Sequence, residues 1–266
     1  MRLLQQQHNI VAMTGDGVND APALKKSDSG VAMGITGTEV SKEAAVMILT
    51  DDNFATIVKA VEYGRALYDN LAKYIRFQMT SLVAFITAFL GAAVFGVAGG
   101  IPFSPLQVLW INFAITVPIA IALGFDQPSP GLMARRPRPL QQPVLSRAQW
   151  VRIVFLALIM AAGTLLVEAS YGPGGAVLAA TMGATTFSLF HVFAGLSSRS
   201  ETRTAFTPDV VADRRQLGLY GLALVLTVLA TELGVLQRLL GTASLDGQQW
   251  LVCVVVALAG SLCTAC

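Results

Sequence analysis

Six long apolar segments follow one another in the chain after residue 77. They occupy residues 78–98, 106–125, 151–169, 177–195, 217–236 and 250–264, and polar or glycine-rich and proline-rich connections separate them. A helix of about 20 apolar residues is long enough to cross the hydrocarbon core of a bilayer. The pattern therefore predicts an all-α membrane domain of six transmembrane helices, with the lipid bilayer around it.

The first 66 residues have a different pattern, in which short apolar runs alternate with longer polar stretches. The runs at 10–13, 30–33 and 46–49 are typical of buried strands, and the segments 21–26 and 39–45 are typical of helices. Because strands and helices alternate, we expect a parallel sheet. Three strands leave a sheet edge and apolar surface uncovered, so this part is predicted to be a fragment of a larger α/β domain.

A single helix is expected to join these two parts. Asp52 or Asn53 is placed to cap a helix that begins near residue 55, and the helix is expected to continue into the first apolar segment. We therefore divide the chain into residues 1–66 and residues 67–266. The long helix would act as a lever between them.

Composition supports the membrane assignment. Hydrophobic residues make up 54% of the chain and charged residues only 13%, whereas about a quarter of an average soluble protein is charged. The net charge of +2, together with the absence of a basic run with interleaved aromatic residues, argues against a nucleic-acid partner. The polar residues 1–8 lack the apolar core of a signal peptide, so the amino terminus is expected to stay in the cytoplasm.

Arginine is concentrated in alternate connections between the apolar segments. The second and fourth connections contain Arg135, Arg136, Arg138, Arg147, Arg199, Arg203, Arg214 and Arg215, whereas the first and third contain neither Lys nor Arg. Positively charged loops stay on the cytoplasmic side of a membrane. Lys73 and Arg76 place the α/β part on that same side, and six crossings return the chain to it. The sequence thus predicts a multi-pass protein of the cell membrane with both termini in the cytoplasm.

Cysteine occurs only near the carboxyl terminus, at Cys253, Cys263 and Cys266. The apolar surroundings favour reduced thiols that pack within a membrane helix. The spacing of Cys263 and Cys266 also resembles half of a metal or redox motif, but the sequence has no second cysteine pair and no nearby histidine to complete one.

The loop after the first predicted strand is the strongest candidate for chemistry. It reads Thr-Gly-Asp-Gly-Val-Asn-Asp-Ala-Pro-Ala-Leu over residues 14–24, and Asp16, Asn19 and Asp20 follow the carboxyl end of the strand. Two carboxylates a few residues apart repel each other unless a positive ion lies between them, and Mg²⁺ prefers hard oxygen ligands. The loop is therefore predicted to bind Mg²⁺ with a phosphate group behind it.

This loop resembles the Mg²⁺ motif of the P-type ATPases, in the haloacid-dehalogenase-like phosphorylation domain of ion pumps. Residues 37–40, 49–54, 62–65, 109–112, 122–125 and 133–139 are also similar to the type II, calcium-pump-like members of that family. The resemblance implies that Asp16, Asn19 and Asp20 take part in catalysis and that Asp16 and Asp20 bind Mg²⁺ as the cofactor. It also implies that ATP is the substrate of the complete pump.

The resemblance further implies what this polypeptide lacks. The sequence contains no Asp-Lys-Thr-Gly-Thr motif, which carries the phosphorylated aspartate of the family. The actuator domain, the nucleotide-binding domain and the first four helices have no counterpart either. We therefore expect the carboxyl-terminal portion of an ATP-driven cation pump, which couples aspartyl-phosphate turnover to cation movement and is not active alone. The alternative is a non-enzymatic, truncated or degenerate membrane relative; a channel or passive carrier is less favoured, because nothing resembles a selectivity filter.

The transport site is the part in which the sequence departs from the family. Where calcium pumps have carboxylates on the fifth, sixth and eighth helices, this sequence has Phe85, Thr116 and His191, and Asn112 alone agrees with the family. Asn112, Thr116 and His191 are therefore the candidate ligands of the transported cation. They supply little negative charge, whereas Ca²⁺ is bound by several oxygen ligands that are often carboxylates, so the identity of the cation stays open.

Other polar residues within the apolar segments have two interpretations. His191 either carries a proton or binds a metal, or it stays neutral and donates a hydrogen bond to a helix carbonyl. Pro118 loosens the backbone hydrogen bonds of its helix, which favours an ion pathway beside Asn112. Glu168 and Glu232 each lie near a helix end, where we expect solvation at the membrane interface.

Overall fold

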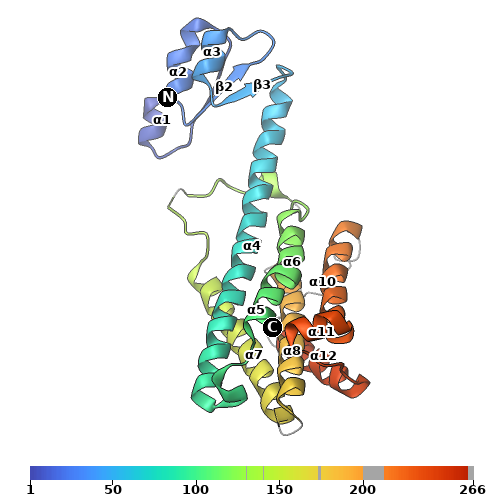
Figure 1. The fold of residues 1–266 in the computed structure, drawn as a ribbon. Helices are drawn as coiled ribbons and strands as arrows, with labels where there is room; N and C mark the ends of the chain where they lie inside the picture. The colour runs from blue at the N-terminus through green and yellow to red at the C-terminus, as the bar shows by residue number, and fades with distance from the viewer. Residues whose placement is uncertain (130, 140, 173–174, 200–212, 263–266) are drawn as a thin grey trace. The chain divides into compact units, whose positions relative to one another are not determined.

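The computed structural model describes residues 1–129, 131–139, 141–172, 175–199 and 213–262 (Figure 1). Contacts between residues divide the chain into two compact units. The first unit consists of Met1–Leu67 with Pro128–Gln142, and the second of Tyr68–Gln127 with Pro143–Cys266. Arg203, Cys263 and Cys266, on which parts of the sequence predictions depend, lie outside the described residues.

The first unit contains a parallel sheet with the strand order β1-β2-β3. Its strands are β1 (Ala12–Gly15), β2 (Ser29–Met33) and β3 (Met47–Leu49), and its short helices are α1 (Arg2–Gln6), η1 (Val18–Asp20), α2 (Ala21–Lys26), α3 (Glu39–Ala44) and η4 (Leu132–Ala134). The predicted parallel sheet with intervening helices is confirmed, although β1 begins at Ala12 and not at residue 10.

The sheet is covered only in part. Leu24 of α2 and Val31 of the central strand β2 are each 2% exposed and form its core. On β3, by contrast, Met47 is 40% exposed and Ile48 is 48% exposed. The uncovered apolar edge that the sequence predicts is therefore present.

A helix of 42 residues, α4 (Phe54–Phe95), continues from the first unit into the second. Asn53 caps its first turn, because its Oδ1 accepts a hydrogen bond from the Ala55 N–H at 3.0 Å. Asp51 supports this start by accepting hydrogen bonds from the Asn53 N–H at 3.1 Å and from the Thr56 hydroxyl at 2.7 Å. The prediction of one long helix that reaches into the first apolar segment is confirmed.

Residues 128–142 belong to the first unit through Arg65 of α4. Its guanidinium group donates hydrogen bonds to the carbonyls of Leu132 at 3.1 Å and of Arg135 at 3.0 Å. One side chain thus holds several backbone carbonyls of the connection that contains Arg135, Arg136 and Arg138.

The second unit is built from helices (Figure 1). After α4 they are η2 (Val97–Gly100), α5 (Pro105–Trp110), the π-helical η3 (Ile111–Ile115), α6 (Thr116–Gly124), α7 (Arg147–Tyr171), α8 (Ala176–Ser198), α10 (Arg214–Glu232), α11 (Gly234–Leu240) and α12 (Gly247–Leu262). Helix α8 contacts α6, α7, α10 and α12, so it is the central helix of this unit.

Four helical stretches in the described part of the chain are long and apolar enough to cross a membrane: α4, Pro105–Gly124, α7 and α8. A fifth is added if α10 and α11, which meet at a bend of 82°, form one broken span. Helix α12 is apolar but contains only 16 residues. All six predicted apolar segments form helices, and four or five of them qualify as spans by length and composition.

The bend between α10 and α11 has a local cause. Leu233 leaves the helical conformation with φ −88° and ψ 113°, so the last carbonyls of α10 lose their helical donors. Side chains replace them, because Gln237 donates to the Thr231 carbonyl and Thr242 donates to the Ala230 carbonyl. The predicted segment 217–236 is therefore interrupted at a position where apolar character alone gives no signal.

The apolar core of the second unit lies around α8. Phe187 and Phe190 of this helix are buried together with Phe77 of α4 and Phe103. Gly195 lets α8 approach α6 closely, because a Cβ at this position would overlap the side chain of Ile119. The core thus holds α8 in place, and the polar groups on α8 are held with it.

Candidate functional site

The loop after β1 brings Asp16 and Asp20, the predicted Mg²⁺ ligands, to one cleft, whereas Asn19 does not line it. Asp16 follows β1 and is exposed, Asn19 is exposed within η1, and Asp20 is half-buried before α2. The Oδ2 atom of Asp20 accepts hydrogen bonds from the backbone N–H groups of Asp16 at 3.2 Å and Gly17 at 3.0 Å. Gly15 makes this possible, because a Cβ at that position would lie 2.5 Å from the Asp20 Cβ. Asp20 therefore fixes the backbone of the loop.

The backbone of Asp16 is also tied to α3. Its carbonyl oxygen accepts hydrogen bonds from the Thr38 N–H at 2.8 Å and from the Ser41 hydroxyl at 3.0 Å. Thr38 caps α3 as well, since its hydroxyl accepts from the Ser41 N–H at 3.3 Å. The main chain at Asp16 is thus held from two sides, while its side chain stays exposed.

A third carboxylate, Asp52, organises the turn after β2. Its Oδ1 accepts hydrogen bonds from the N–H groups of Gly34 at 2.7 Å and Ile35 at 3.0 Å, and its Oδ2 accepts from the N–H and the hydroxyl of Thr36, both at 2.8 Å. These hydrogen bonds, with that from Ile35 the strongest contribution, lower the pKa of Asp52 to about 2. From the sequence Asp52 is only a candidate helix cap, although its position shortly after the strand β3 is a signal for this second role.

A cleft of about 430 Å³ lies at the carboxyl ends of the strands. Its lining consists of Thr14, Gly15, Asp16, Asp20, Met33, Thr36 and Asp52. No group of three or more His, Cys, Asp or Glu side chains in the described residues is placed to hold a metal ion. Mg²⁺, however, is commonly bound through one or two carboxylates, with phosphate oxygens and water as further ligands. The donor set of Asp16 and Asp20 fits that kind of site.

The candidate cation ligands Asn112 and Thr116 lie at an irregular part of the α5–α6 stretch. The Asn112 side-chain amide donates to the Val108 carbonyl at 2.9 Å, and the Thr116 hydroxyl donates to the Ile111 carbonyl at 2.9 Å. The backbone between them is π-helical. Such turns within α-helices occur frequently at functional sites. The backbone beside Asn112 is therefore irregular, and the ion pathway that Pro118 favours there stays a prediction.

His191 is fully buried on α8, and both of its ring nitrogens have partners. Nδ1 lies 2.8 Å from the Phe187 carbonyl, and Nε2 lies 2.7 Å from the Ser81 hydroxyl. Because a carbonyl only accepts, Nδ1 donates to it, and Nε2 of the neutral ring accepts from Ser81. This geometry supports the neutral interpretation of His191. None of the hydrogen bonds described joins His191 to Asn112 or Thr116.

An aromatic cluster surrounds Phe85, the position where the family resemblance implies a carboxylate of the fifth pump helix. The Phe85 ring centroid lies 4.6 Å from that of Phe187 and 5.9 Å from those of Phe103 and His191. Aromatic rings do not supply the oxygen ligands that a hard cation needs. Phe85 therefore offers no ligand to such a cation.

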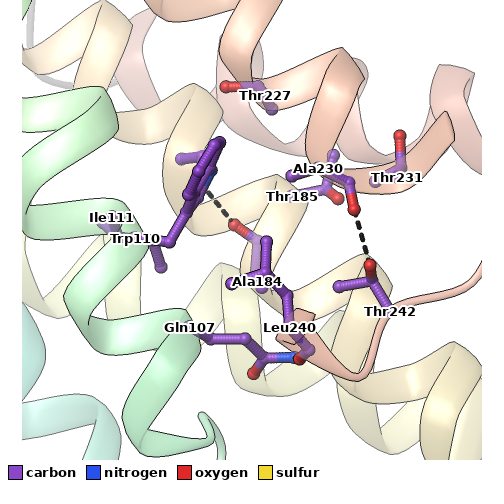
Figure 2. Close-up of a pocket in the computed structure, with 11 residues that line it drawn as sticks. Gln107, Trp110, Ile111, Ala184, Thr185, Thr227, Ala230, Thr231, Leu240 and Thr242 are labelled. Atoms are coloured by element: carbon purple, nitrogen blue, oxygen red, sulfur yellow. Dashed lines mark hydrogen bonds between the residues drawn. The ribbon is translucent and has the colours of Figure 1, made fainter. Parts of the chain in front are cut away.

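A small cavity of about 20 Å³ lies beside the π-helical segment (Figure 2). Its lining comes from α5, η3, α8, α10, α11 and the connection that follows, and it includes Gln107 and the hydroxyl-bearing residues Thr185, Ser188, Thr227, Thr231 and Thr242. A cavity of this size holds one water molecule when polar groups surround it. Sequence reasoning missed these residues, although the cluster of Thr and Ser on α8 is a signal for a polar helix face.

A buried ionic cluster centred on Asp126 was also not predicted. Asp126 follows α6 and is 8% exposed. Its Oδ2 lies 2.7 Å from the Lys73 ammonium, and its Oδ1 accepts hydrogen bonds from Arg199 at 2.8 Å and Gln216 at 2.6 Å. Burial by itself raises the pKa of Asp126, but the hydrogen bonds and charges of Arg199 and Lys73 outweigh it and lower the pKa below its ordinary value.

Asn70 extends the Asp126 cluster to the end of α6. Its side-chain amide donates to the carbonyls of Gly124 at 3.2 Å and Asp126 at 2.7 Å, and its Oδ1 accepts from Lys73 at 3.1 Å. Carbonyls at a helix end have no intrahelical partner. The cluster therefore caps α6 and joins it to α4, α8 and α10 through polar side chains.

Glu168 corrects a prediction from the sequence. It lies near the end of α7 but is only 1% exposed, so interfacial solvation is wrong for this residue. The side chain turns toward α8, where Gly183 leaves room for it. Glu232 is exposed at the end of α10, which agrees with the same prediction.

Cys253 is buried, and its thiol donates to the Met182 carbonyl at 3.6 Å, as expected for a packed thiol.

Comparison with known proteins identifies a family. The family model described as "Cation transporting ATPase, C-terminus" matches residues 100–265. Calcium-transporting ATPase 1 of Schizosaccharomyces pombe is 42% identical over 213 residues, which are 79% of this chain and 24% of the relative. The calcium-transporting ATPase of Bacillus subtilis is 34% identical over 273 residues, which are 99% of this chain and 30% of the relative.

A third relative is described more generally. The probable cation-transporting ATPase F of Mycobacterium bovis is 36% identical over 267 residues, which are 100% of this chain and 29% of the relative. The chain thus spans less than a third of the length of each of these relatives. The matches confirm the family that the motifs predicted.

Proposed function

The chain belongs to the P-type cation-transporting ATPases, and on that premise we propose that it is the carboxyl-terminal portion of an ATP-driven cation pump. The observation that carries the proposal is α4, a single helix of 42 residues that begins just after β3 and continues into an apolar stretch. A continuous helix is a rigid element. It can therefore pass a movement at the sheet to the membrane segments.

In this proposal residues 1–66 are the carboxyl-terminal part of a haloacid-dehalogenase-like phosphorylation domain. Asp16, Asn19 and Asp20 take part in catalysis, and Asp16 and Asp20 hold Mg²⁺, which would offset the charge of a phosphate group in the cleft. The chain itself positions these groups. Asp20 holds the backbone of the loop through two N–H groups, and Asp52 holds the turn after β2. ATP is the substrate of the complete pump.

Residues 67–266 form the membrane domain in this proposal, with six transmembrane helices and both termini in the cytoplasm. The pairing of α10 with α11 supports the fifth span, and the apolar character of α12 supports the sixth. The distribution of arginine supports the orientation. The phosphorylated aspartate, the actuator domain, the nucleotide-binding domain and the first four helices would come from the remainder of the pump, because the chain spans less than a third of its relatives.

The transported cation is proposed to bind beside Asn112 and Thr116, with His191 as the third candidate ligand. The π-helical backbone at residues 111–115 supports the first two positions. Two relatives are named as calcium-transporting. None of the three candidate ligands in this chain is a carboxylate, so the cation has to be found by comparing several ions.

A chimaera tests the proposed function. This chain is joined in frame to the amino-terminal portion of the Bacillus subtilis relative, and membranes with the chimaera, the chain alone or the intact relative are assayed for ATPase activity and aspartyl phosphate. Mg²⁺, Ca²⁺, Mn²⁺, Na⁺ and K⁺ are compared as stimulating cations. We expect cation-stimulated turnover in the chimaera and none in the chain alone.

Two variants of the chimaera separate the two parts of the proposal. Asp16→Asn should lower the turnover rate at least about 100-fold, because it removes a preorganised electrostatic group. Asn112→Ala should retain phosphorylation by ATP but lose its dependence on the cation. A chimaera that inserts into the membrane and gives no phosphoenzyme, while the intact relative does, would favour a non-enzymatic membrane relative instead.

A further inference from the structure

Glu168 is a buried acidic residue that the proposed pump mechanism does not use. It lies on α7, is 1% exposed, and both of its carboxyl oxygens are buried without a hydrogen-bond partner among the described residues. Polar groups in a protein interior almost always have partners, and an ionisable group at membrane depth suggests function. The surroundings of Glu168 therefore call for an explanation.

The Glu168 carboxyl group packs closely against α8. A Cβ on Gly183 of α8 would lie 2.6 Å from the Glu168 Cδ, so the carboxyl group is pressed against the α8 backbone. Neither the cavity of Figure 2 nor the cleft beside Asp16 is lined by Glu168.

Two hydroxyl-bearing residues lie at helical spacing from Glu168 and Gly183. Thr164 lies one turn before Glu168 on α7, and Thr186 lies one turn after Gly183 on α8. Both are 0% exposed. The Thr164 hydroxyl is buried without a partner among the described residues, and the Thr186 hydroxyl lies beside the Cys253 thiol. Residues three or four positions apart lie on one face of a helix. The spacing therefore places Thr164 and Thr186 on the helix faces that contain Glu168 and Gly183.

The elements around α7 bring no cation to the seam between α7 and α8. Helices α8 and α12, the turn η2 and the part of α4 after Phe77 contain no Lys, Arg, Asp or Glu. Their titratable groups are His191, which is engaged by Ser81 and Phe187, and Cys253, which donates to the Met182 carbonyl. An anionic carboxylate would therefore be buried without a compensating charge, which is strongly unfavourable.

We propose that Glu168 is a proton-binding site in the seam between α7 and α8. A proton is the one cation that neutralises the carboxylate without needing a cavity. The resulting carboxylic acid can donate a hydrogen bond to a neighbouring hydroxyl group, and Thr164 and Thr186 are the candidates by spacing. Release of the proton would leave a charge that only water or a cation could offset, so protonation and closure of the seam are linked. The inference does not depend on the proposed pump function.

Infrared spectroscopy of the purified chain in vesicles of ether-linked phosphatidylcholine, which has no ester carbonyl, tests this inference. The carbonyl stretching band of a protonated carboxylic acid should be present at pH 7 in the wild type and absent in Glu168→Gln. Glu232→Gln is the matched control, because Glu232 is an exposed acid at the end of α10, and it should keep the band. Absence of the band in the wild type, or its persistence in Glu168→Gln, would overturn the proposal.

A second variant covers the case in which Glu168→Gln does not fold. Thr164→Val with Thr186→Val keeps Glu168 and removes both candidate acceptors, so the band should remain but shift to the frequency of a free acid. An unchanged frequency would show that the hydroxyls are not its partners. Raising the pH should remove the band of the wild type and accelerate amide exchange in α7 and α8 by more than the base-catalysed increase that α10 shows. An equal increase in all three helices while the band disappears would refute the link between protonation and closure.

Discussion

Asp126 and Glu168 are both buried acidic residues of the second unit, but their surroundings are opposite. Asp126 is in contact with Lys73 at 2.7 Å and Arg199 at 2.8 Å. Glu168 has no described hydrogen-bond partner and faces the backbone of α8 at Gly183. A buried charge persists only where partners compensate it. Burial alone therefore does not define the role of a carboxyl group, because its partners decide whether it serves as an anion or as a neutral acid.

The largest effect is expected from Asp126→Asn. The amide keeps the shape of the side chain but leaves the charges of Lys73 and Arg199 buried without an anion. Loss of one partner from a buried ion pair costs about 3–5 kcal/mol. Unfolding of the chain in detergent micelles should show a loss of this size, whereas Glu232→Gln at an exposed position should change the stability by less than about 0.5 kcal/mol. Equal effects of the two variants would mean that the cluster is not formed.

Acidification should produce the same loss of folding stability in the wild type. The pKa of Asp126 is lower than its ordinary value of 3.8, because Arg199 and Lys73 outweigh the effect of burial. A carboxyl group with a lowered pKa in the folded state stabilises the fold above its ordinary value, and this contribution is lost as the pH falls through the folded value. The unfolding midpoint of the wild type should therefore fall more steeply below about pH 4 than that of Asp126→Asn. Parallel curves would contradict this assignment.

An intermediate effect is expected from Gly183→Ala. The added methyl group would overlap the Glu168 carboxyl group, and overpacking of this kind costs about 1–3 kcal/mol. Gly221→Ala on α10 is the matched control, because a Cβ there meets nothing within 4 Å. Combining Gly183→Ala with Glu168→Ala should recover part of the loss, since the shorter side chain frees the space. If the stability losses of the two single variants simply add in the double variant, the two side chains are not in contact.

Much of the fold follows from patterns that are local in the sequence. Apolar character over whole helices predicts α7 and α8, and the polar loop between a strand and a helix predicts the positions of Asp16 and Asp20. The break at Leu233 is different, because it depends on Gln237 and Thr242, whose side chains replace the lost donors. Local hydropathy contains no information on such replacements.

The Asp126 cluster was missed because its members are far apart in the sequence. Lys73, Arg199 and Gln216 are separated from Asp126 by 53, 73 and 90 positions. Each looks like an ordinary polar residue beside an apolar segment, and Lys73 and Arg199 served only to orient the chain. Glu168 was misread for a related reason. Its distance from the helix end is visible in the sequence, but the neighbour that receives its side chain is not.

The smallest effect is expected from Glu168→Gln, although it is the same change from acid to amide as Asp126→Asn. A neutral carboxylic acid and an amide have nearly the same size and no charge, and a volume-conserving exchange in a core costs less than about 1.5 kcal/mol. Unfolding in micelles at pH 7 measures both variants side by side. If Glu168 were an anion with a cationic partner, its replacement would cost as much as that of Asp126. A small loss at Glu168 beside a large loss at Asp126 would show that two buried acids of one helical unit are held in opposite protonation states.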